Sequence, residues 1–394
     1  MIRILFLFLS LMMVMPQARA QKKEISQARD FIKNGKDLEK AEGMMRQLLQ
    51  NPQNRQNLKI HATLCDAVSA QYEQANKRLY LHQKQDTAAF FNLIRKMYLA
   101  GEAMDSVDAM PDAKGKVKIS YRDSHAEVLT RLMPNLYAGG NFFLKKQQWQ
   151  QAFDFYETYM DCYQQPLFSV ALKGQAESDK RRVQAAYWAL FSAHNMQNPV
   201  LTLRHRELAL QEQSKREFAL QYIAEAWLQL KDDSMYQATL RTGFDEYPLD
   251  AYFYPRLTDC LTANRQYEEA LAITDKAIEA CDTCKLFLFA KSNLMLNLGR
   301  NDEAVEYARQ VAGEDFIEAY YTAGTALLNK VAKLNERTDK AAIQALYKEA
   351  LPFMEHFRQS APEEKDRWAP ALYRIYLNLN MGKQFDEIDL LLKK

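Results

Sequence analysis

The sequence predicts an all-α fold, an α-solenoid in which antiparallel helix pairs stack into a right-handed superhelix. A motif recurs at a fixed interval: NRQYEEALAI at 264–273 is followed 34 residues later by LGRNDEAVEY at 298–307, and such a period is typical of repeated helical hairpins. The 394 residues include only 12 Gly and 11 Pro, which favours helices over turn-rich β structure. Apolar residues recur at three- and four-residue spacing within each repeat, which places them on one side of a helix.

The first twenty residues differ from the rest of the chain. Arg3 precedes an uncharged apolar run from Ile4 to Met15, and Ala18 and Ala20 form a small-x-small cleavage pattern. As a helix this run would span about 18 Å, whereas a bilayer core measures about 30 Å. We therefore expect residues 1–20 to be a signal peptide, with a retained membrane anchor as the alternative. The mature protein would be exported to the periplasm of a Gram-negative cell, or secreted, with no integral membrane span.

The charge balance argues against a nucleic-acid partner. The chain has 52 Lys and Arg against 50 Asp and Glu, and removing residues 1–20 would remove Arg3 and Arg19 and no acid. The mature chain would then be neutral, without the basic surface that nucleic acid requires. With 48% apolar and 26% charged residues, the composition is that of a folded protein.

The predicted helices follow in order from the N-terminus. Residues 57–84 and 86–108 have the pattern of long amphipathic helices, and an Asp-Thr pair opens the second as a cap. The segment 109–121, AMPDAKGKVKISY, contains Pro and Gly and no apolar periodicity, which predicts a loop or linker. Ser124 and Glu127 then have the spacing of a capping box for the next helix.

Three contiguous units of 34 residues begin at Glu217, Ala251 and Lys285. Small residues such as Ala270 and Ala304 occupy the same place in successive second helices. Small side chains there let the two helices of a hairpin approach, while larger ones fill the remaining volume. The repeat therefore predicts its own packing.

These units resemble those of tetratricopeptide-repeat (TPR) proteins. The resemblance divides the mature chain into a helical, degenerate TPR-like region at 21–108, the linker at 109–121 and a TPR array at 122–394, with a second irregular connection at 165–181. The array units are expected near 133–166, 183–216, 217–250, 251–284, 285–316, 317–362 and 369–394. A helical N-terminal part before the repeats is similar to a group of exported bacterial TPR proteins, and that likeness implies no agreed substrate or reaction.

Motifs for catalysis or metal binding do not emerge from the sequence. The six His residues are scattered, without an H-E-x-x-H or another paired-ligand spacing. Neither a P-loop nor a G-x-G-x-x-G or G-x-S-x-G pattern occurs. We therefore predict a non-enzyme with no catalytic residue, no cofactor and no metal.

The five cysteines need separate treatment. Cys281 and Cys284 form CDTC between two repeats, and a C-x-x-C can be a redox pair, half a zinc site or a local disulfide. No βαβ setting and no second C-x-x-C accompanies it, so redox and zinc chemistry are disfavoured. A Cys281–Cys284 disulfide in an oxidising compartment and a pair without a bond both remain open. Cys65, Cys162 and Cys260 fit small buried side chains.

The TPR resemblance implies a concave wall built by first-helix residues, where a protein or peptide would bind. The residues at those positions are Tyr137, Asn141, Gln221, Glu225, Tyr252, Asp259, Phe289, Asn293 and Tyr321. Aromatic side chains supply contact area and amides can pair with a peptide backbone; the alternative for each is packing against a neighbouring helix. The favoured function is a periplasmic adaptor, followed by a self-assembling component of the cell envelope and then by a hydrolase with an unrecognised site.

Overall fold

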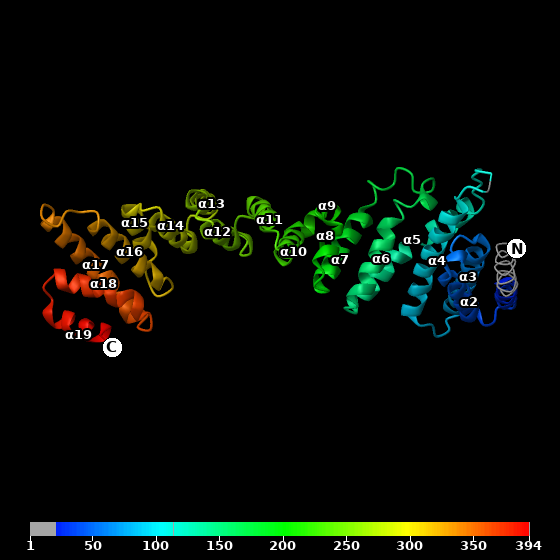
Figure 1. Cartoon of the computed structure of the whole chain (residues 1–394), viewed down its shortest axis with the longest axis horizontal. Coiled ribbons are helices and arrows are strands. Elements are labelled where there is room, and N and C mark those ends of the chain that lie inside the picture. The colour runs from blue at the N-terminus through cyan, green and yellow to red at the C-terminus, as the bar shows by residue number, and fades with distance from the viewer. Residues whose placement is uncertain (1–20, 113, 394) are drawn as a thin grey trace, which may run out of the picture. The chain divides into compact units, whose positions relative to one another are not determined.

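The computed structural model describes residues 21–112 and 114–393. These residues form helices, turns and an isolated β-bridge between Gly313 and Phe316, so the all-α prediction is confirmed. The predicted signal peptide lies outside the described residues. The chain divides into two compact units, Met1–Lys231 and Asp232–Lys394 (Figure 1).

The first unit is a series of antiparallel helices, each packed on the next. After a helix over residues 21–34, its elements are α2 (Leu38–Gln50), η1 (Pro52–Asn54), α3 (Leu58–Tyr80), α4 (Thr87–Asp108), α5 (Arg122–Lys145), α6 (Trp149–Asp161), η2 (Pro166–Phe168), α7 (Lys180–Asn195), α8 (Pro199–Arg204), α9 (Arg206–Ala209), η3 (Gln213–Lys215) and α10 (Arg216–Gln229). The cap predicted for α4 is present, because the Asp86 carboxylate accepts a hydrogen bond from the Ala89 N–H at 3.0 Å.

The second unit continues the same alternation. Its helices are α11 (Asp233–Glu246), α12 (Phe253–Ala263), α13 (Tyr267–Ala280), α14 (Lys285–Asn297), α15 (Asn301–Val311), α16 (Ile317–Val331), α17 (Lys340–Ser360), α18 (Lys365–Asn378) and α19 (Gly382–Leu392). Each helix packs on the one that follows. Helices α12 to α19 therefore form four consecutive hairpins, and the architecture is an α-solenoid of TPR-type helix pairs.

The 34-residue interval is visible in the backbone. Residues with positive φ follow the first helices at Gln197, Lys231, Arg265 and Gly299, each 34 residues after the one before. A residue in this left-handed conformation ends a helix and lets the chain turn back. Gln147 ends α5 in the same way. The sequence period thus corresponds to one repeated turn geometry.

Small residues stand where the two helices of a hairpin approach most closely. Ala270 and Ala304 are fully buried. At Gly140 in α5, an added Cβ would lie 2.6 Å from the ring of Tyr156 in α6. The large side chain occupies the space that the small one leaves, as close packing requires.

Ion pairs link successive second helices across hairpins. In the first unit they are Glu42–Lys96 (3.0 Å), Asp154–Arg95 (3.4 Å) and Glu157–Arg204 (2.8 Å). In the second they are Arg241–Glu269 (2.6 Å), Arg309–Glu349 and Arg358–Glu387. Partly exposed pairs of this kind contribute about 0–1 kcal/mol each, so they favour the hairpin register more than they stabilise the fold.

The capping box predicted at the start of α5 is wrong. The helix begins at Arg122, two residues earlier than the prediction requires. Ser124 lies inside the first turn, where its hydroxyl donates to the Tyr121 carbonyl at 3.0 Å. Glu127 is consequently too far along the helix to close a box with it.

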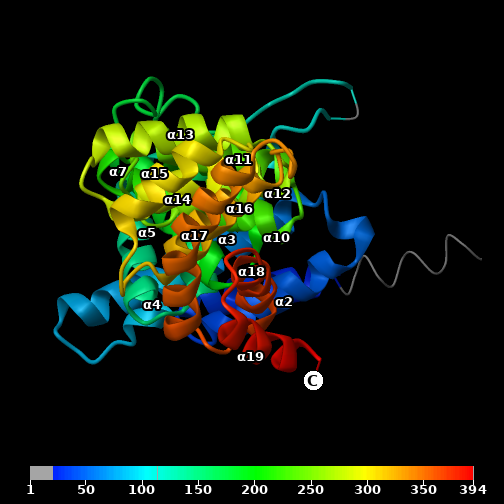
Figure 2. The same cartoon turned by 90° about the vertical axis from the view of Figure 1, so that its left-hand side faces the viewer.

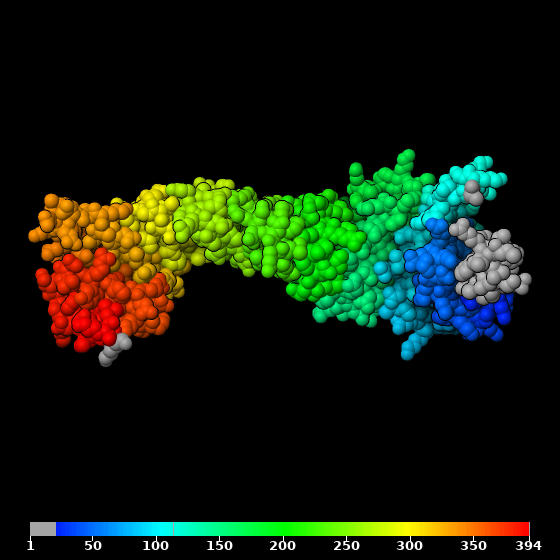
Figure 3. All heavy atoms as spheres, in the orientation of Figure 1, coloured from blue at the N-terminus to red at the C-terminus, as the bar shows by residue number. Residues whose placement is uncertain are grey.

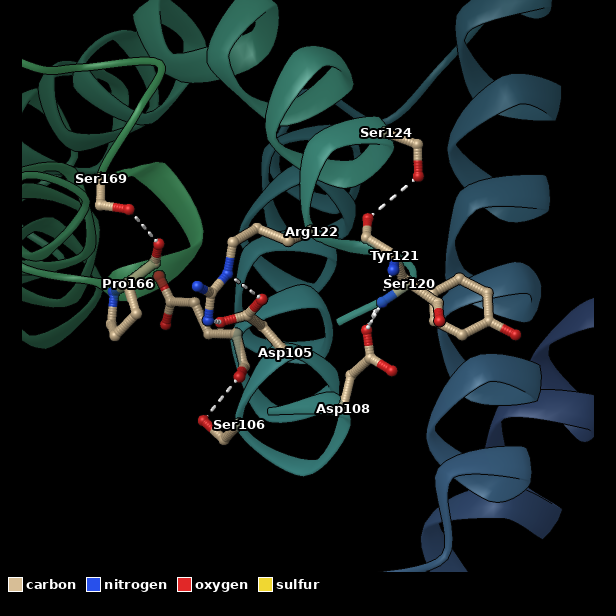
Figure 4. Close-up of polar contacts among 10 residues, drawn as sticks. Asp105, Ser106, Asp108, Ser120, Tyr121, Arg122, Ser124, Pro166 and Ser169 are labelled. Carbon is tan, nitrogen blue, oxygen red and sulfur yellow. Dashed lines mark hydrogen bonds and ion pairs between the residues drawn. The ribbon is translucent and has the colours of Figure 1, made fainter. Parts of the chain in front are cut away.

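A carboxylate from the preceding helix caps α5 instead. Asp108, the last residue of α4, accepts hydrogen bonds from the backbone N–H groups of Ser120 (2.6 Å) and Tyr121 (2.9 Å) (Figure 4). The guanidinium of Arg122 donates two hydrogen bonds of 2.8 Å to Asp105, also in α4. Both carboxylates are buried. They hold together the two ends of the connection between α4 and α5.

Candidate partner-binding surface

The predicted binding residues lie on the first helices of the hairpins or at their starts. In the first unit α5 contacts α7 and α7 contacts α10, and in the second α14 contacts α16 and α16 contacts α18. We call the surface formed by the first helices of a unit its first-helix face. Four predicted residues lie in the first unit: Tyr137, Asn141, Gln221 and Glu225. Five lie in the second: Tyr252, Asp259, Phe289, Asn293 and Tyr321.

In the first unit, Tyr137 and Asn141 hold helices together. The Tyr137 hydroxyl donates to the Gln184 side-chain oxygen of α7 at 3.0 Å, and its ring lies 5.8 Å from that of Tyr156. Asn141 accepts a hydrogen bond of 2.7 Å from the Tyr156 hydroxyl. Burial raises the pKa of Tyr137, so it remains a neutral donor. Both residues follow the packing alternative at least in part.

A second cluster joins α7 to α10. The rings of His194 and Tyr222 lie 4.4 Å apart, and Phe191 contacts Tyr222 at 5.7 Å. The Glu225 carboxylate is 3.6 Å from His194 Nε2. Burial lowers the pKa of His194, so the ring is neutral at neutral pH. Gln221 is half-buried on the same helix.

In the second unit, Phe289 and Asn293 connect α14 to α16. Phe289 packs against Phe316 with ring centroids 5.6 Å apart. The Thr322 hydroxyl donates to Asn293 Oδ1 at 2.6 Å. Phe289 and Asn293 remain half-buried, so both keep surface for a further contact.

Tyr321 lies between an aromatic ring and a guanidinium. Its ring contacts Phe357 at 5.0 Å, and the Arg367 guanidinium lies 4.0 Å from its centroid. Arg367 donates to both oxygens of Glu318, at 2.9 and 2.5 Å. These hydrogen bonds raise the pKa of Arg367, which therefore stays charged. The arrangement offers a fixed cation and an aromatic edge on the first-helix face.

The two remaining predicted residues lie at α12. The Arg256 guanidinium covers the Tyr252 ring at 3.9 Å, and Phe253 packs on its edge at 5.3 Å. Asp259, one turn from the end of the helix, is exposed. Of the nine predicted side chains, Asp259 is the one exposed to solvent in the described structure.

Sequence reasoning missed several residues of this face because it lacked the hairpin phase. Gln184, Phe191 and His194 in α7 take part in the contacts described above, although none was predicted. Arg367 was missed because the last unit was expected near 369, whereas α18 begins at Lys365. A turn residue 34 positions before Lys231 would have set the phase of α7, but positive φ at a Gln has no sequence signature.

Both cysteines of the CDTC segment carry free thiols in the structure, as do Cys65, Cys162 and Cys260. A hydrogen bond from the Cys284 thiol lowers the pKa of Cys281. Cys65 and Cys162 are buried and Cys260 is half-buried, and burial raises the pKa of Cys65 to about 12. The disulfide between Cys281 and Cys284 stays a prediction for an oxidising compartment.

Two searches of the described residues found no further feature. They contain no group of three or more His, Cys, Asp and Glu that could hold a metal ion. Within the same part of the chain, every helix is too short or too polar to cross a membrane.

Comparisons with known proteins yield likenesses among solved structures. No protein-family model and no curated protein matches the sequence. The chain is similar to the C-terminal part of a TPR repeat-containing protein from Cytophaga hutchinsonii, at 11% identity and a TM-score of 0.41, covering 64% of this chain and 92% of that chain. It is also similar to a tetratricopeptide repeat protein from Parabacteroides merdae, at 12% identity and a TM-score of 0.24, covering 77% and 99%. The description of the fold rests on the helices themselves.

Proposed function

We propose that this protein is a non-catalytic scaffold of the periplasm that binds a segment of another protein along the first-helix face of its second unit. The observation that carries the proposal is the recurrence of half-buried aromatic and amide side chains on successive first helices: Tyr252, Phe289, Asn293 and Tyr321. Aromatic side chains supply contact area and edge or face contacts, and amides can pair with peptide groups.

The polar contacts of this face suggest the character of the partner. Asn293 uses its Oδ1 for Thr322, and an amide side chain has two further donors to offer. Asp259 is exposed on α12, which favours a neutral or basic segment over an acidic one. The leader-like residues 1–20 support export, and with it a partner in the cell envelope.

Site-specific photo-crosslinking in intact cells tests this proposal. A photoreactive residue in place of Asp259 on α12 should capture a partner, whereas the same residue in place of Glu306 on the second helix α15 should not. Both positions are exposed acids of the same unit, so the loss of charge is matched. Equal capture from both positions, or none from Asp259, would contradict a binding surface on the first helices.

Self-assembly is the second candidate, and helix α19 favours it. Only Ile388 is buried in this helix, while Leu390 is 63% and Leu392 43% exposed. An apolar strip of this kind can pair between two copies. Light scattering at two concentrations should then give a mass that falls when both leucines are changed to Ser; a monomer at both concentrations excludes this candidate.

A further inference from the structure

The turn between α3 and α4 carries a cluster of exposed apolar side chains. Leu79, Tyr80 and Leu81 are consecutive, and they are 40%, 84% and 51% exposed. Scattered exposed apolar residues are normal on any protein, whereas a contiguous group of large ones marks a surface that contacts something. This cluster is therefore unlike the isolated exposed leucines elsewhere in the chain.

The same turn is cationic. Residues 77–85 read KRLYLHQKQ, with three basic residues and no acid. Arg78 donates to the neutral amide of Gln74 at 3.3 Å. Among the ion pairs of the described residues, none includes Lys77, Arg78 or Lys84, so their charges face solvent without a fixed counter-ion.

Hydrogen bonds give the turn a defined shape. His82 has a φ of 53°, and the Gln83 N–H donates to the Arg78 carbonyl at 2.9 Å, which is how a Schellman motif ends a helix. The Leu81 N–H keeps its helical bond to the Lys77 carbonyl at 3.0 Å. The turn projects beyond the neighbouring helices of its unit (Figure 2), and Figure 3 shows it as a protrusion of the molecular surface.

A polar groove of about 580 Å³ lies beside the turn. Six residues supply most of its polar lining: Gln74, Arg78, Gln85, Asn92, Arg95 and Lys96. Lys96 is paired with Glu42 at 3.0 Å and Arg95 with Asp154 at 3.4 Å, which leaves Arg78 as the cation available to a ligand. The amides add hydrogen-bond donors, so the groove suits a phosphate-bearing headgroup.

We propose that this turn docks the protein on the surface of an anionic lipid bilayer. Leu79, Tyr80 and Leu81 would enter the headgroup region, where a Tyr ring with its polar hydroxyl is favoured. The cations of residues 77–85 would contact lipid phosphates, each strengthening binding about fivefold. Because the apolar cluster is convex and projecting, it fits an extended soft surface better than a bound peptide, which needs a concave site.

A second segment of similar composition provides a matched control. Residues 116–119 read KVKI, and Val117 and Ile119 are 56% and 40% exposed. This segment follows α4, whereas the proposed docking turn precedes it, so the two lie at opposite ends of the same helix. No pocket of the described structure is lined by the KVKI segment.

Co-sedimentation with vesicles tests the proposal. The chain from Gln21 onward is used, because the apolar run 4–15 would enter any bilayer by itself. It should sediment with vesicles of phosphatidylcholine and phosphatidylglycerol in equal parts, not with phosphatidylcholine alone, and binding should weaken with added salt. Changing all three cations, Lys77, Arg78 and Lys84, to Gln should weaken binding on the order of a hundredfold.

Two further variants separate docking from general stickiness. Tyr80→Ser should weaken binding several-fold at low salt, and a control with Lys116 and Lys118 changed to Gln should bind like the unmodified chain. All these side chains are exposed, so circular dichroism should show each variant folded. The proposal is overturned if the unmodified chain ignores phosphatidylglycerol vesicles, if the triple variant still binds fully, or if the control loses binding equally. Binding to soluble poly-glutamate without vesicle binding would assign the turn to an acidic protein instead.

Discussion

Replacing Gly140 by Ala tests whether the approach of α5 to α6 limits the stability of the first unit. The added Cβ would lie 2.6 Å from the Tyr156 ring. That ring cannot move aside freely, because Tyr156 is fully buried and its hydroxyl donates to Asn141 at 2.7 Å. Overpacking of this kind costs about 1–3 kcal/mol. The better helix propensity of Ala offsets about 0.5–1 kcal/mol of this.

Gly43 provides the matched control. It lies inside helix α2 of the same unit, and a Cβ there would meet nothing within 4 Å. Gly43→Ala should therefore stabilise the first unit by about 0.5–1 kcal/mol. Because the propensity gain is common to both variants, the difference between them isolates the overpacking, about 1–3 kcal/mol.

Urea unfolding followed by tryptophan fluorescence measures this difference. Trp149, Trp188 and Trp227 lie in the first unit and Trp368 in the second, so a Trp368→Phe background reports on the first unit alone. The indole N–H of Trp368 is buried without a hydrogen-bond partner within the described structure, so this background loses no hydrogen bond. Equal midpoints for the two glycine variants, or a more stable Gly140→Ala, would refute the packing argument.

Three other predictions concern packing, pH and thiol reactivity. Ala270→Leu should destabilise the second unit by about 1–3 kcal/mol, because Ala270 is fully buried, while the exposed Ala263→Leu leaves the melting temperature within about 1 kcal/mol of the original. Burial raises the pKa of Glu102 from 4.5 to about 7, so the folded state binds the extra proton and stability falls as pH rises from 4.5 through 7; Glu102→Gln should remove that fall in melting temperature. Because its pKa is lowered, Cys281 should be alkylated before the buried Cys162 in a mass-spectrometric time course, and the reverse order would contradict the structure.

The helical repeat was accessible from the sequence because its signals are local. Small residues such as Ala270 and Ala304 recur at the period of the hairpin, and their burial follows from the stripe they belong to. The cap of α4 was likewise predictable, since Asp86 acts on a residue three positions away. Short-range chemistry of this kind can be read without knowing which helices meet.

The start of α5 shows where that approach stops. Its cap is Asp108, twelve residues before Ser120, and no local pattern predicts a cap contributed by another helix. The Ser124 and Glu127 spacing was therefore misleading, because a capping box presumes that the helix supplies its own cap.

The candidate binding face combines both kinds of information. The sequence by itself determined that Phe289, Asn293 and Tyr321 would occupy one side of successive first helices, because helical periodicity alone sets which side chains share a face. Only the tertiary structure decided that Asn293 pairs with Thr322 and that Arg367 lies over Tyr321. Contacts between hairpins depend on how far each helix slides and rotates against the next, and that is set by the packing of many side chains at once.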